Sequence, residues 1–352
     1  MFSFVKPLIF GLDPETAHDL AIKSLKLNVV PESLFKVENE EMLETTFLKD
    51  KIKNPIGMAA GFDKSAEVFN ALYKLGFGFV EVGTVTPKKQ LGNPKPRIFR
   101  LEEDEALINR LGFNNDGLEI VKKRLEVGWF TKQGVLGVNI GPNYDSKSYE
   151  QDFYKCAGHL IKLSLADYIT INISSPNTEN LRDFHEENKL ESLIKTINKL
   201  KKELASPMPI FLKVSPDIKD SLGEKISEII INQNIKGVIL TNTTNGNRSS
   251  LKSSQKNQEG GLSGKPIRDL SNKIIKKFYK KLKGKALIIG VGGVDSGQSA
   301  FEKIAAGANA VQLYTGMVYK GPGIVKEIKK DLIQILKKEK IKNISEVIGI
   351  NS

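Results

Sequence analysis

Residues 166–178 read ADYITINISSPNT, a stretch that combines the pattern of a buried strand with an unusually polar end. Ile169, Ile171 and Ile173 alternate along the chain as the residues on one face of a β-strand do. Residues 174–177, which follow directly, are Ser-Ser-Pro-Asn. A simple turn needs only one or two such residues, so this strand end is either a cap or a reaction site.

Seven further runs of this kind occur along the chain and are separated by segments with helical periodicity. They lie at 54–61, 78–85, 134–141, 209–215, 237–243, 286–293 and 310–316. Strands that alternate with helices pair in parallel through right-handed crossovers. Together with 166–174 these eight units predict an α/β fold, a closed (β/α)₈ TIM barrel, with an open doubly wound sheet as the alternative.

The flanking segments predict additions to this barrel. Asp13 and Pro14 are typical of a helix start, and a second short helix is expected at 31–37, so residues 1–45 are interpreted as an N-terminal helical appendage. The barrel is assigned to residues 46–340 and a C-terminal tail to 341–352. The long interval 86–133 predicts an excursion over the barrel mouth, and the polar segment 249–261 predicts an exposed loop.

Composition limits the class of protein. The 352 residues include 53 Lys and Arg against 41 Asp and Glu, a formal net charge of +12. This charge is compatible with nucleic acid, an anionic membrane surface, an anionic small ligand or a lysine-rich proteome. No basic patch is interleaved with aromatic residues, so we expect no nucleic-acid partner.

Cys156 is the single cysteine and its neighbours have helical apolar spacing, which predicts a packed core thiol and excludes an internal disulfide. The three histidines are too scattered for a zinc site, and we predict no metal. No stretch approaches the 18 or more apolar residues of a membrane-spanning helix. The first ten residues are nevertheless rich in Phe, Leu and Ile.

In an α/β barrel the chemistry lies at the carboxyl ends of the strands. Here those ends carry amides, hydroxyls and two lysines, Lys64 and Lys213, and Asp63 is nearly the only carboxylate. Such a ring suits a planar ligand rich in heteroatoms. Glycines lie at or just after the ends of the seventh and eighth runs, at 292, 293, 316, 321 and 323, and indicate a phosphate cradle. The pattern therefore predicts a phosphorylated planar cofactor beside a small anionic heterocycle.

Several longer motifs carry a resemblance to a known family. They are MAAGFDK (58–64), EVGTVTP (81–87), GNPKPRIFRL (92–101), INRLGFNN (108–115), GVNIGPN (137–143), INISSPNTENLR (171–182), LKVSPD (212–217), TNTT (241–244), GGLSGKPI (260–267), IGVGGVDSG (289–297) and VQLYTGMVYKGPG (311–323). They resemble dihydroorotate dehydrogenases nearly end to end, and in particular class 2, the membrane-associated form that reduces a quinone. Ser175, where class 1 enzymes have a cysteine, and the N-terminal appendage favour class 2.

The resemblance implies FMN as cofactor and assigns site residues. The FMN site would consist of Ala60, Gly61, Phe62, Asp63, Lys64, Thr84, Asn139, Asn172, Lys213, Thr241, Gly264, Gly293, Tyr314 and Thr315. The substrate would be bound by Lys64, Asn109, Arg110, Leu111, Gly112, Phe113, Asn172, Asn177, Asn242 and Thr243. The catalytic base would be Ser175, and His18 would line the quinone access.

The implied reaction is the oxidation of dihydroorotate to orotate in de novo pyrimidine (UMP) synthesis. Ser175 would remove a proton from C5 while a hydride leaves C6 for N5 of FMN, and Lys213 would stabilise the charge that develops on the flavin. The apolar N-terminus would place the enzyme peripherally on the cytoplasmic side of the cell membrane, with a ubiquinone-type acceptor and as a monomer. The alternatives are a class 1 enzyme that uses fumarate or NAD, another flavin-binding barrel, and a phosphate-binding barrel lyase without flavin.

Overall fold

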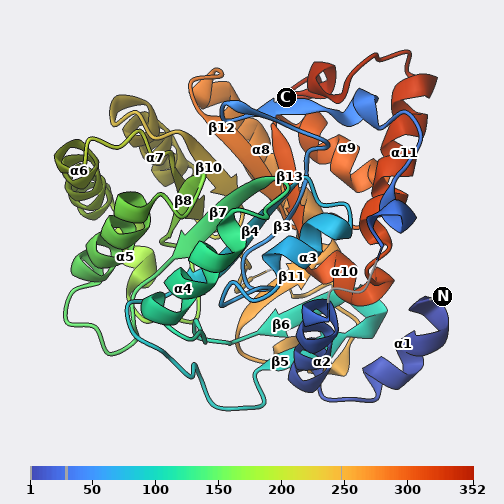
Figure 1. Cartoon of the computed structure of the whole chain (residues 1–352), viewed down its shortest axis with the longest axis horizontal. Coiled ribbons are helices and arrows are strands. Elements are labelled where there is room, and N and C mark those ends of the chain that lie inside the picture. Colours follow the sequence, from blue (N-terminus) through green and yellow to red (C-terminus); the bar gives the residue numbers. More distant parts are fainter. Residues whose placement is uncertain (1, 28–30, 247) are drawn as a thin grey trace.

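The computed structural model describes residues 2–27, 31–246 and 248–352. Its barrel strands are β3 (Ile56–Met58), β4 (Phe79–Val85), β7 (Val135–Ile140), β8 (Tyr168–Asn172), β9 (Ile210–Val214), β10 (Gly237–Leu240), β12 (Leu287–Val291) and β13 (Ala310–Leu313). They pair in parallel and close in the order β10-β12-β13-β3-β4-β7-β8-β9 (Figure 1). Each strand falls within one of the eight predicted runs, so the closed barrel is confirmed and the open sheet is excluded.

Helices surround the barrel because each has one apolar face to bury. They are α3 (Phe69–Lys74), α4 (Leu118–Trp129), α5 (Tyr149–Leu163), α6 (Glu187–Glu203), α7 (Asp220–Asn232), α8 (Arg268–Leu282), α9 (Gly297–Ala305), α10 (Thr315–Lys320) and α11 (Ile324–Lys338). In α8, for example, Ile275 and Phe278 are buried while the lysines of the opposite face reach solvent. Cys156 is buried in α5, as its spacing predicted.

Two helices precede the barrel, α1 (Phe2–Phe10) and α2 (Pro14–Lys26). The carboxylate of Asp13 accepts the first free N–H groups of α2, which is the predicted helix start. The second short helix is present as a 3₁₀ turn at Glu32–Phe35. Residues 1 and 28–30 of the predicted appendage lie outside the described residues.

Both ends of the chain pack against the barrel helices. Lys329 of α11 is buried, and its ammonium donates to the carbonyl of Phe35 at 2.9 Å and to Glu40 at 2.7 Å. Near the C-terminus, Ile344 and Val347 are buried in a 3₁₀ turn. The division into three segments at residues 45 and 340 stays a prediction.

A small antiparallel sheet lies over the mouth of the barrel. It consists of β5 (Ile98–Leu101), β6 (Ala106–Asn109) and β11 (Gly261–Gly264), in the order β11-β6-β5. The first two strands lie in the predicted excursion, whereas the third begins at residue 261, the last residue of the segment expected to be an exposed loop. In Figure 1 helices α1 and α2 lie beside β5 and β6, at the same end of the molecule.

The opposite end of the barrel is closed by a hairpin that the sequence analysis did not predict, β1 (Thr45–Phe47) with β2 (Asp50–Ile52). Phe47 is fully buried, and its ring lies 5.2 Å from that of Phe79, 6.1 Å from Tyr168 and 6.1 Å from Phe211. These three aromatic residues stand near the starts of β4, β8 and β9. A Cβ added at Gly137, on the strand between β4 and β8, would lie 2.1 Å from the Tyr168 ring. Aromatic side chains thus fill the barrel base, and they leave no space for a side chain at position 137.

Replacing Phe47 with alanine should leave a cavity in this layer. We expect Phe47→Ala to lower the free energy of unfolding by about 3–5 kcal/mol, measured by urea denaturation. Phe130→Ala is the matched control because this ring is 91% exposed, and it should change stability by less than about 0.5 kcal/mol. Equal stability of the two variants would show that the hairpin does not fill the base.

Candidate active site

A cleft with about 1350 Å³ of empty space, part of it open to solvent, lies between the carboxyl ends of the barrel strands and the small sheet. Most of the predicted site residues line it. They are Ala60, Gly61, Lys64, Thr84, Asn109, Leu111, Gly112, Phe113, Asn172, Ser175, Asn177, Lys213, Thr241, Asn242, Thr243, Gly264, Gly293, Tyr314 and Thr315. Barrel closure therefore brings together side chains from distant parts of the sequence.

Five predicted residues lie outside this lining: Phe62, Asp63, Asn139, Arg110 and His18. The Asp63 carboxylate accepts the N–H groups of Glu67 at 2.7 Å and Val68 at 2.8 Å, and burial raises its pKa. It stabilises the turn that presents its neighbour Lys64 to the cleft.

Phe62 packs edge-to-face on Tyr314, with the ring centres 5.7 Å apart. Phe62 thus forms a second layer behind an aromatic side chain of the cleft wall.

The Arg110 side chain points away from the cleft. Its guanidinium donates to the carbonyls of Pro96 at 2.9 Å and Glu259 at 3.1 Å, and it lies over the Phe99 ring at 4.7 Å. Its neighbour Asn109 does line the cleft. Arg110 therefore holds this part of the loop in place and does not present its charge to a ligand.

Asn139 orients two residues of the cleft floor from below. Its side-chain oxygen accepts from the Thr84 hydroxyl at 2.7 Å and from the Asn172 amide at 3.2 Å. Its own amide donates to Glu81 at 2.8 Å. Because the network fixes which end of each amide faces upward, Asn172 presents a defined pattern of donors and acceptors.

Glu81 is a fully buried carboxylate beneath this floor, a group that sequence reasoning missed. It also accepts hydrogen bonds from Tyr168 at 2.9 Å, Thr170 at 3.2 Å and the amide nitrogen of Gln312 at 3.2 Å. A buried charge requires such compensation. Within the described residues the Gln312 side-chain oxygen has no partner, although it is buried in a residue that lines the cleft. The Gln312 oxygen is therefore available to accept a hydrogen bond from a ligand. In the sequence, the only sign of this role is that Gln312 is an amide residue within the apolar run 310–316.

Lys213 is a buried cation on β9 that faces the same cleft. No hydrogen bond or ion pair to its ammonium exists within the described ranges. Burial lowers its pKa, and the negative charge of Glu81 partly opposes that effect. A cation in this position favours an anionic ligand or negative charge that develops during a reaction.

Ser175 lies at the edge of the cleft and is 4% exposed. Its oxygen accepts the N–H of Asn177 at 3.2 Å, and the Asn177 amide donates to the carbonyl of Asn109 at 3.1 Å. In the described part of the chain no histidine or carboxylate is hydrogen-bonded to Ser175. The hydroxyl is therefore not activated as in a Ser-His-Asp triad, and it suits only the removal of a proton that is already acidified.

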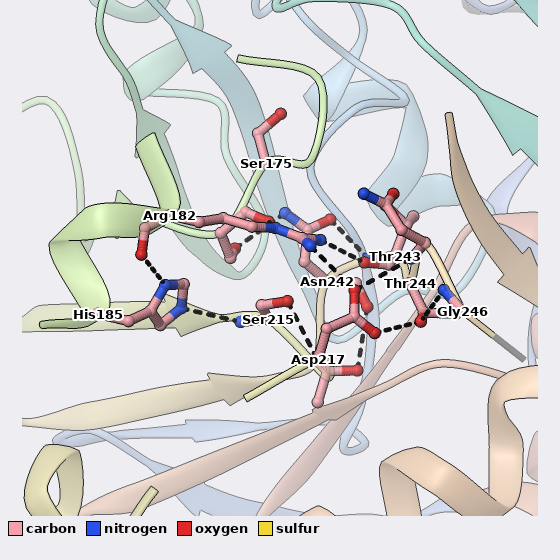
Figure 2. A network of polar contacts seen from close by, with 12 residues as sticks. Ser175, Arg182, His185, Ser215, Asp217, Asn242, Thr243, Thr244 and Gly246 are labelled. Atoms are coloured by element: carbon pink, nitrogen blue, oxygen red, sulfur yellow. Dashed lines mark hydrogen bonds and ion pairs between the residues drawn. The ribbon is translucent and has the colours of Figure 1, made fainter. Parts of the chain in front are cut away.

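Asn242 and Thr243 extend the polar wall next to Ser175, on a neighbouring loop (Figure 2). The Asn242 amide donates to the Ser174 hydroxyl at 2.9 Å, and its oxygen accepts the N–H of Thr243 at 2.8 Å. The side chain of Asn242 thus has a fixed orientation.

His18 brings helix α2 into contact with the cleft wall. Its Nε2 lies 3.1 Å from the Lys64 ammonium. Burial lowers the pKa of Lys64 to about 8, and burial together with the Lys64 charge lowers the pKa of His18 to about 2. The imidazole is therefore neutral at pH 7 and accepts a hydrogen bond from Lys64, whose side chain lines the cleft.

A buried ion pair fastens α2 to the loop over the mouth. The Arg97 guanidinium donates to both carboxylate oxygens of Glu15, at 3.1 Å and 2.6 Å. The same guanidinium donates to the carbonyls of Leu91 at 2.6 Å and Asn93 at 2.7 Å. This bidentate geometry makes the N-terminal helix part of the site architecture.

The glycines at one end of the cleft fit a phosphorylated cofactor. Gly264 and Gly293 have φ angles of +98° and +74°, and an added Cβ would meet Glu105 at 2.4 Å and Arg268 at 2.6 Å. Only glycine fits both positions, and the exposed backbone there can approach a phosphate closely.

Of the other predicted cradle glycines, Gly292 and Gly316 also line the cleft. Gly321 instead packs against Phe2, and Gly323 immediately precedes α11.

Two further cleft residues were missed. Ser263 shares a 2.9 Å hydrogen bond with Thr315, and the Tyr319 hydroxyl donates to the carbonyl of Ala106 at 2.8 Å. Both residues stand in quoted motifs, but only the pairing of β11 with β6 places Ser263 opposite the end of β13.

His185 connects the loop after β8 to the end of β9 (Figure 2). Its Nδ1 donates to the carbonyl of Arg182 at 2.8 Å, and its Nε2 accepts the N–H of Ser215 at 3.2 Å. These partners require the neutral imidazole, and burial lowers its pKa to about 4.

The chain is similar to proteins of one family along nearly its whole length. A family model described as Dihydroorotate dehydrogenase matches residues 42–336. A dihydroorotate dehydrogenase (quinone) from Bartonella tribocorum is 46% identical over 342 residues, which are 96% of this chain and 93% of the relative. The mitochondrial dihydroorotate dehydrogenase (quinone) of Mus musculus is 43% identical, covering 97% of this chain and 87% of the relative. The crystal structure of DHODH from Eimeria tenella in complex with ferulenol matches with a TM-score of 0.91 and 37% identity, and 98% of each chain is covered.

The neutral state of His185 predicts a pH dependence of stability. The unfolded chain binds this proton near pH 6.5 and the folded chain only near pH 4, so the stabilising contribution is complete above pH 6.5 and is lost as the pH falls toward 4. In His185→Asn the free energy of unfolding should fall less steeply with acidification, by up to about 1.4 kcal/mol per pH unit. Urea unfolding at several pH values between 7 and 4.5 measures the difference, and parallel curves would contradict it.

Proposed function

Because the chain belongs to the dihydroorotate dehydrogenase family, we propose that it oxidises dihydroorotate to orotate in pyrimidine biosynthesis and passes the electrons to a quinone. One observation carries this proposal beyond the family name. A single cleft contains a shielded serine hydroxyl, several fixed asparagine amides and two lysines that are not paired with a carboxylate within the described residues. This set matches a small anionic heterocycle that must lose a proton and a hydride.

The family implies a flavin cofactor, and we assign it as FMN. Lys213, the free oxygen of Gln312 and the amide of Asn172 would hold the polar edge of the ring, and the glycine-lined end with Thr315 would hold the phosphate. When bound, the flavin supplies the hydride acceptor. The unpaired oxygen of Gln312 supports this fit because it needs a donor such as a ring N–H.

Lys64 would bind the carboxylate of the substrate. Asn109, Asn177 and Asn242 would bind the carbonyl and NH groups of the substrate ring. These contacts polarise the substrate carbonyls and thereby acidify the C5 proton. The Ser175 oxygen takes that proton while the hydride leaves C6, and a C5–C6 double bond forms. As Ser175 takes the C5 proton, its own hydroxyl proton would pass to a water or threonine relay that leads to solvent, since no histidine or carboxylate is hydrogen-bonded to it in the described part of the chain.

Ser175→Ala tests this assignment. The variant should keep its flavin and bind orotate, but flavin reduction by dihydroorotate should slow by about 100-fold or more, because the proton acceptor is lost. Anaerobic mixing with dihydroorotate, followed by the loss of flavin absorbance, measures the rate. Reduction near the rate of the unmodified enzyme would reject Ser175 as the base.

The oxidant would reach the flavin beside α1 and α2. Tyr319 lines the cleft, and its ring lies 5.5 Å from Phe10 of α1. His18 of α2 lies 6.3 Å from the ring of Tyr314, another cleft residue. These contacts support quinone access between the two helices and the barrel mouth.

The same helices expose apolar side chains to solvent, with Phe4 85% and Leu8 76% exposed. None of the helices in the described ranges has the length and apolar character needed to cross a bilayer. The exposed apolar side chains of α1 support a position of this helix in the lipid interface, and we propose that the protein lies peripherally on the cytoplasmic side of the cell membrane. We also propose that the protein acts as a monomer.

The membrane contact is testable with surface substitutions. Phe4→Ser combined with Leu8→Ser should reduce binding to vesicles of anionic phospholipid by about tenfold or more, because two apolar side chains that would enter the lipid are lost. The matched control is Val127→Ser with Phe130→Ser, because both side chains are exposed at the end of α4. Sedimentation with vesicles measures binding, and equal losses in the two double variants would argue against an interface formed by α1.

A further inference from the structure

The loop that carries Ser175 is joined to the loops after β9 and β10 by one ion pair (Figure 2). A guanidinium nitrogen of Arg182 lies 3.0 Å from the Asp217 carboxylate, and both side chains are about one quarter exposed (26% and 27%). Neither residue lines the cleft. Any effect on the reaction must therefore act through the residues that they hold.

Arg182 binds directly next to the site. Its Nε donates to the carbonyl of Ser174, the neighbour of Ser175, at 3.3 Å. A terminal nitrogen donates to the carbonyl of Thr243, which lines the cleft, at 3.3 Å. The planar guanidinium thus bridges the loop of Ser174 and the loop of Thr243, and both loops contribute residues to the cleft lining.

Asp217 binds the remaining partners. Its carboxylate accepts from the hydroxyl of Thr244 and from the N–H of Asn245, the latter at 3.0 Å. Its own N–H donates to the hydroxyl of Ser215 at 3.1 Å. The loops after β8, β9 and β10 therefore all meet at Asp217, which itself follows the β9 strand that carries Lys213.

We propose that Arg182 and Asp217 are positioning residues that hold the loop of Ser175 in place against the loop of Asn242 and Thr243 and thereby position Ser175 for proton removal. This inference rests on the proposed function, because the role of Ser175 as proton acceptor is itself part of that proposal. The neutral imidazole of His185 anchors the same segment to Ser215.

The effect should fall on catalysis more than on folding. Partly exposed ion pairs contribute little to stability, typically about 0–1 kcal/mol. A displacement of a reacting group by about 1 Å, in contrast, can slow a reaction about 100-fold. The arrangement therefore predicts a variant that is folded and binds its flavin but is reduced slowly.

Asp217→Asn separates the two effects because it keeps the shape of the side chain and removes its charge. We expect flavin reduction by dihydroorotate, measured anaerobically by stopped flow, to slow by about 10- to 100-fold. Reoxidation of the pre-reduced flavin by a soluble quinone should stay within about twofold of the unmodified enzyme. Flavin content and melting temperature should also be close to those of the unmodified enzyme.

Asp183→Asn is the matched control, with the same chemical change in the same segment. Asp183 pairs with Lys189 at 3.2 Å, and both side chains are 44–47% exposed. Within the described residues neither side chain is hydrogen-bonded to the loops after β9 and β10. This variant should reduce its flavin at the normal rate. Arg182→Lys provides a second test, since lysine can reach Asp217 but cannot also bridge Ser174 and Thr243, and it should be slow in the same half-reaction.

Several results would overturn the proposal. Normal flavin reduction in both Asp217→Asn and Arg182→Lys would show that the ion pair does not position Ser175. Equal slowing of reduction and reoxidation, or loss of flavin, would show a general structural role. Failure of dihydroorotate to bleach the flavin of the unmodified enzyme would instead contradict the proposed function itself, which makes the two failures distinguishable.

Discussion

Eight parallel strands close into a barrel only if side chains fill its interior, and in this chain the filling changes from one end to the other. At the base, Phe47 and the aromatic residues of β4, β8 and β9 form an apolar layer. One level higher, the hydroxyl of Tyr168 reaches the buried carboxylate of Glu81. Above that carboxylate lie Asn139 and the cleft floor. The polarity of the site is therefore built up in layers along the barrel axis.

Glu81 lies between the aromatic layer at the barrel base and the polar floor of the cleft, and it is hydrogen-bonded to both. Its carboxylate accepts hydrogen bonds from four neutral side chains and forms no ion pair within the described residues. It lies close enough to Lys213 to oppose the desolvation of that cation. The cleft thus combines a charge-compensated floor with two lysines that have no carboxylate partner among the described residues, and this arrangement favours the binding of an anion and the stabilisation of an anionic product.

The sequence was sufficient for the strands and for most of the cleft lining, because period-two apolar runs and barrel topology together determine where strand ends meet. Side-chain direction was harder to predict. Arg110 and Asn139 stand in the expected motifs, yet one turns outward to Pro96 and the other points down to Glu81. Both directions depend on contacts with segments distant in sequence, which no local pattern encodes.

The hairpin at the base was missed because its three-residue strands are too short to show a period, although Phe47 and Ile52 are both buried in it. The burial of Phe47 has a consequence for biosynthesis. Phe47 leaves the ribosome before every barrel strand, yet its apolar cluster includes Ile289 and Ala310 near the other end of the chain. The first aromatic residue of the base to be synthesised is therefore fully covered only after the last barrel strand has been made, so this apolar layer is completed late in synthesis.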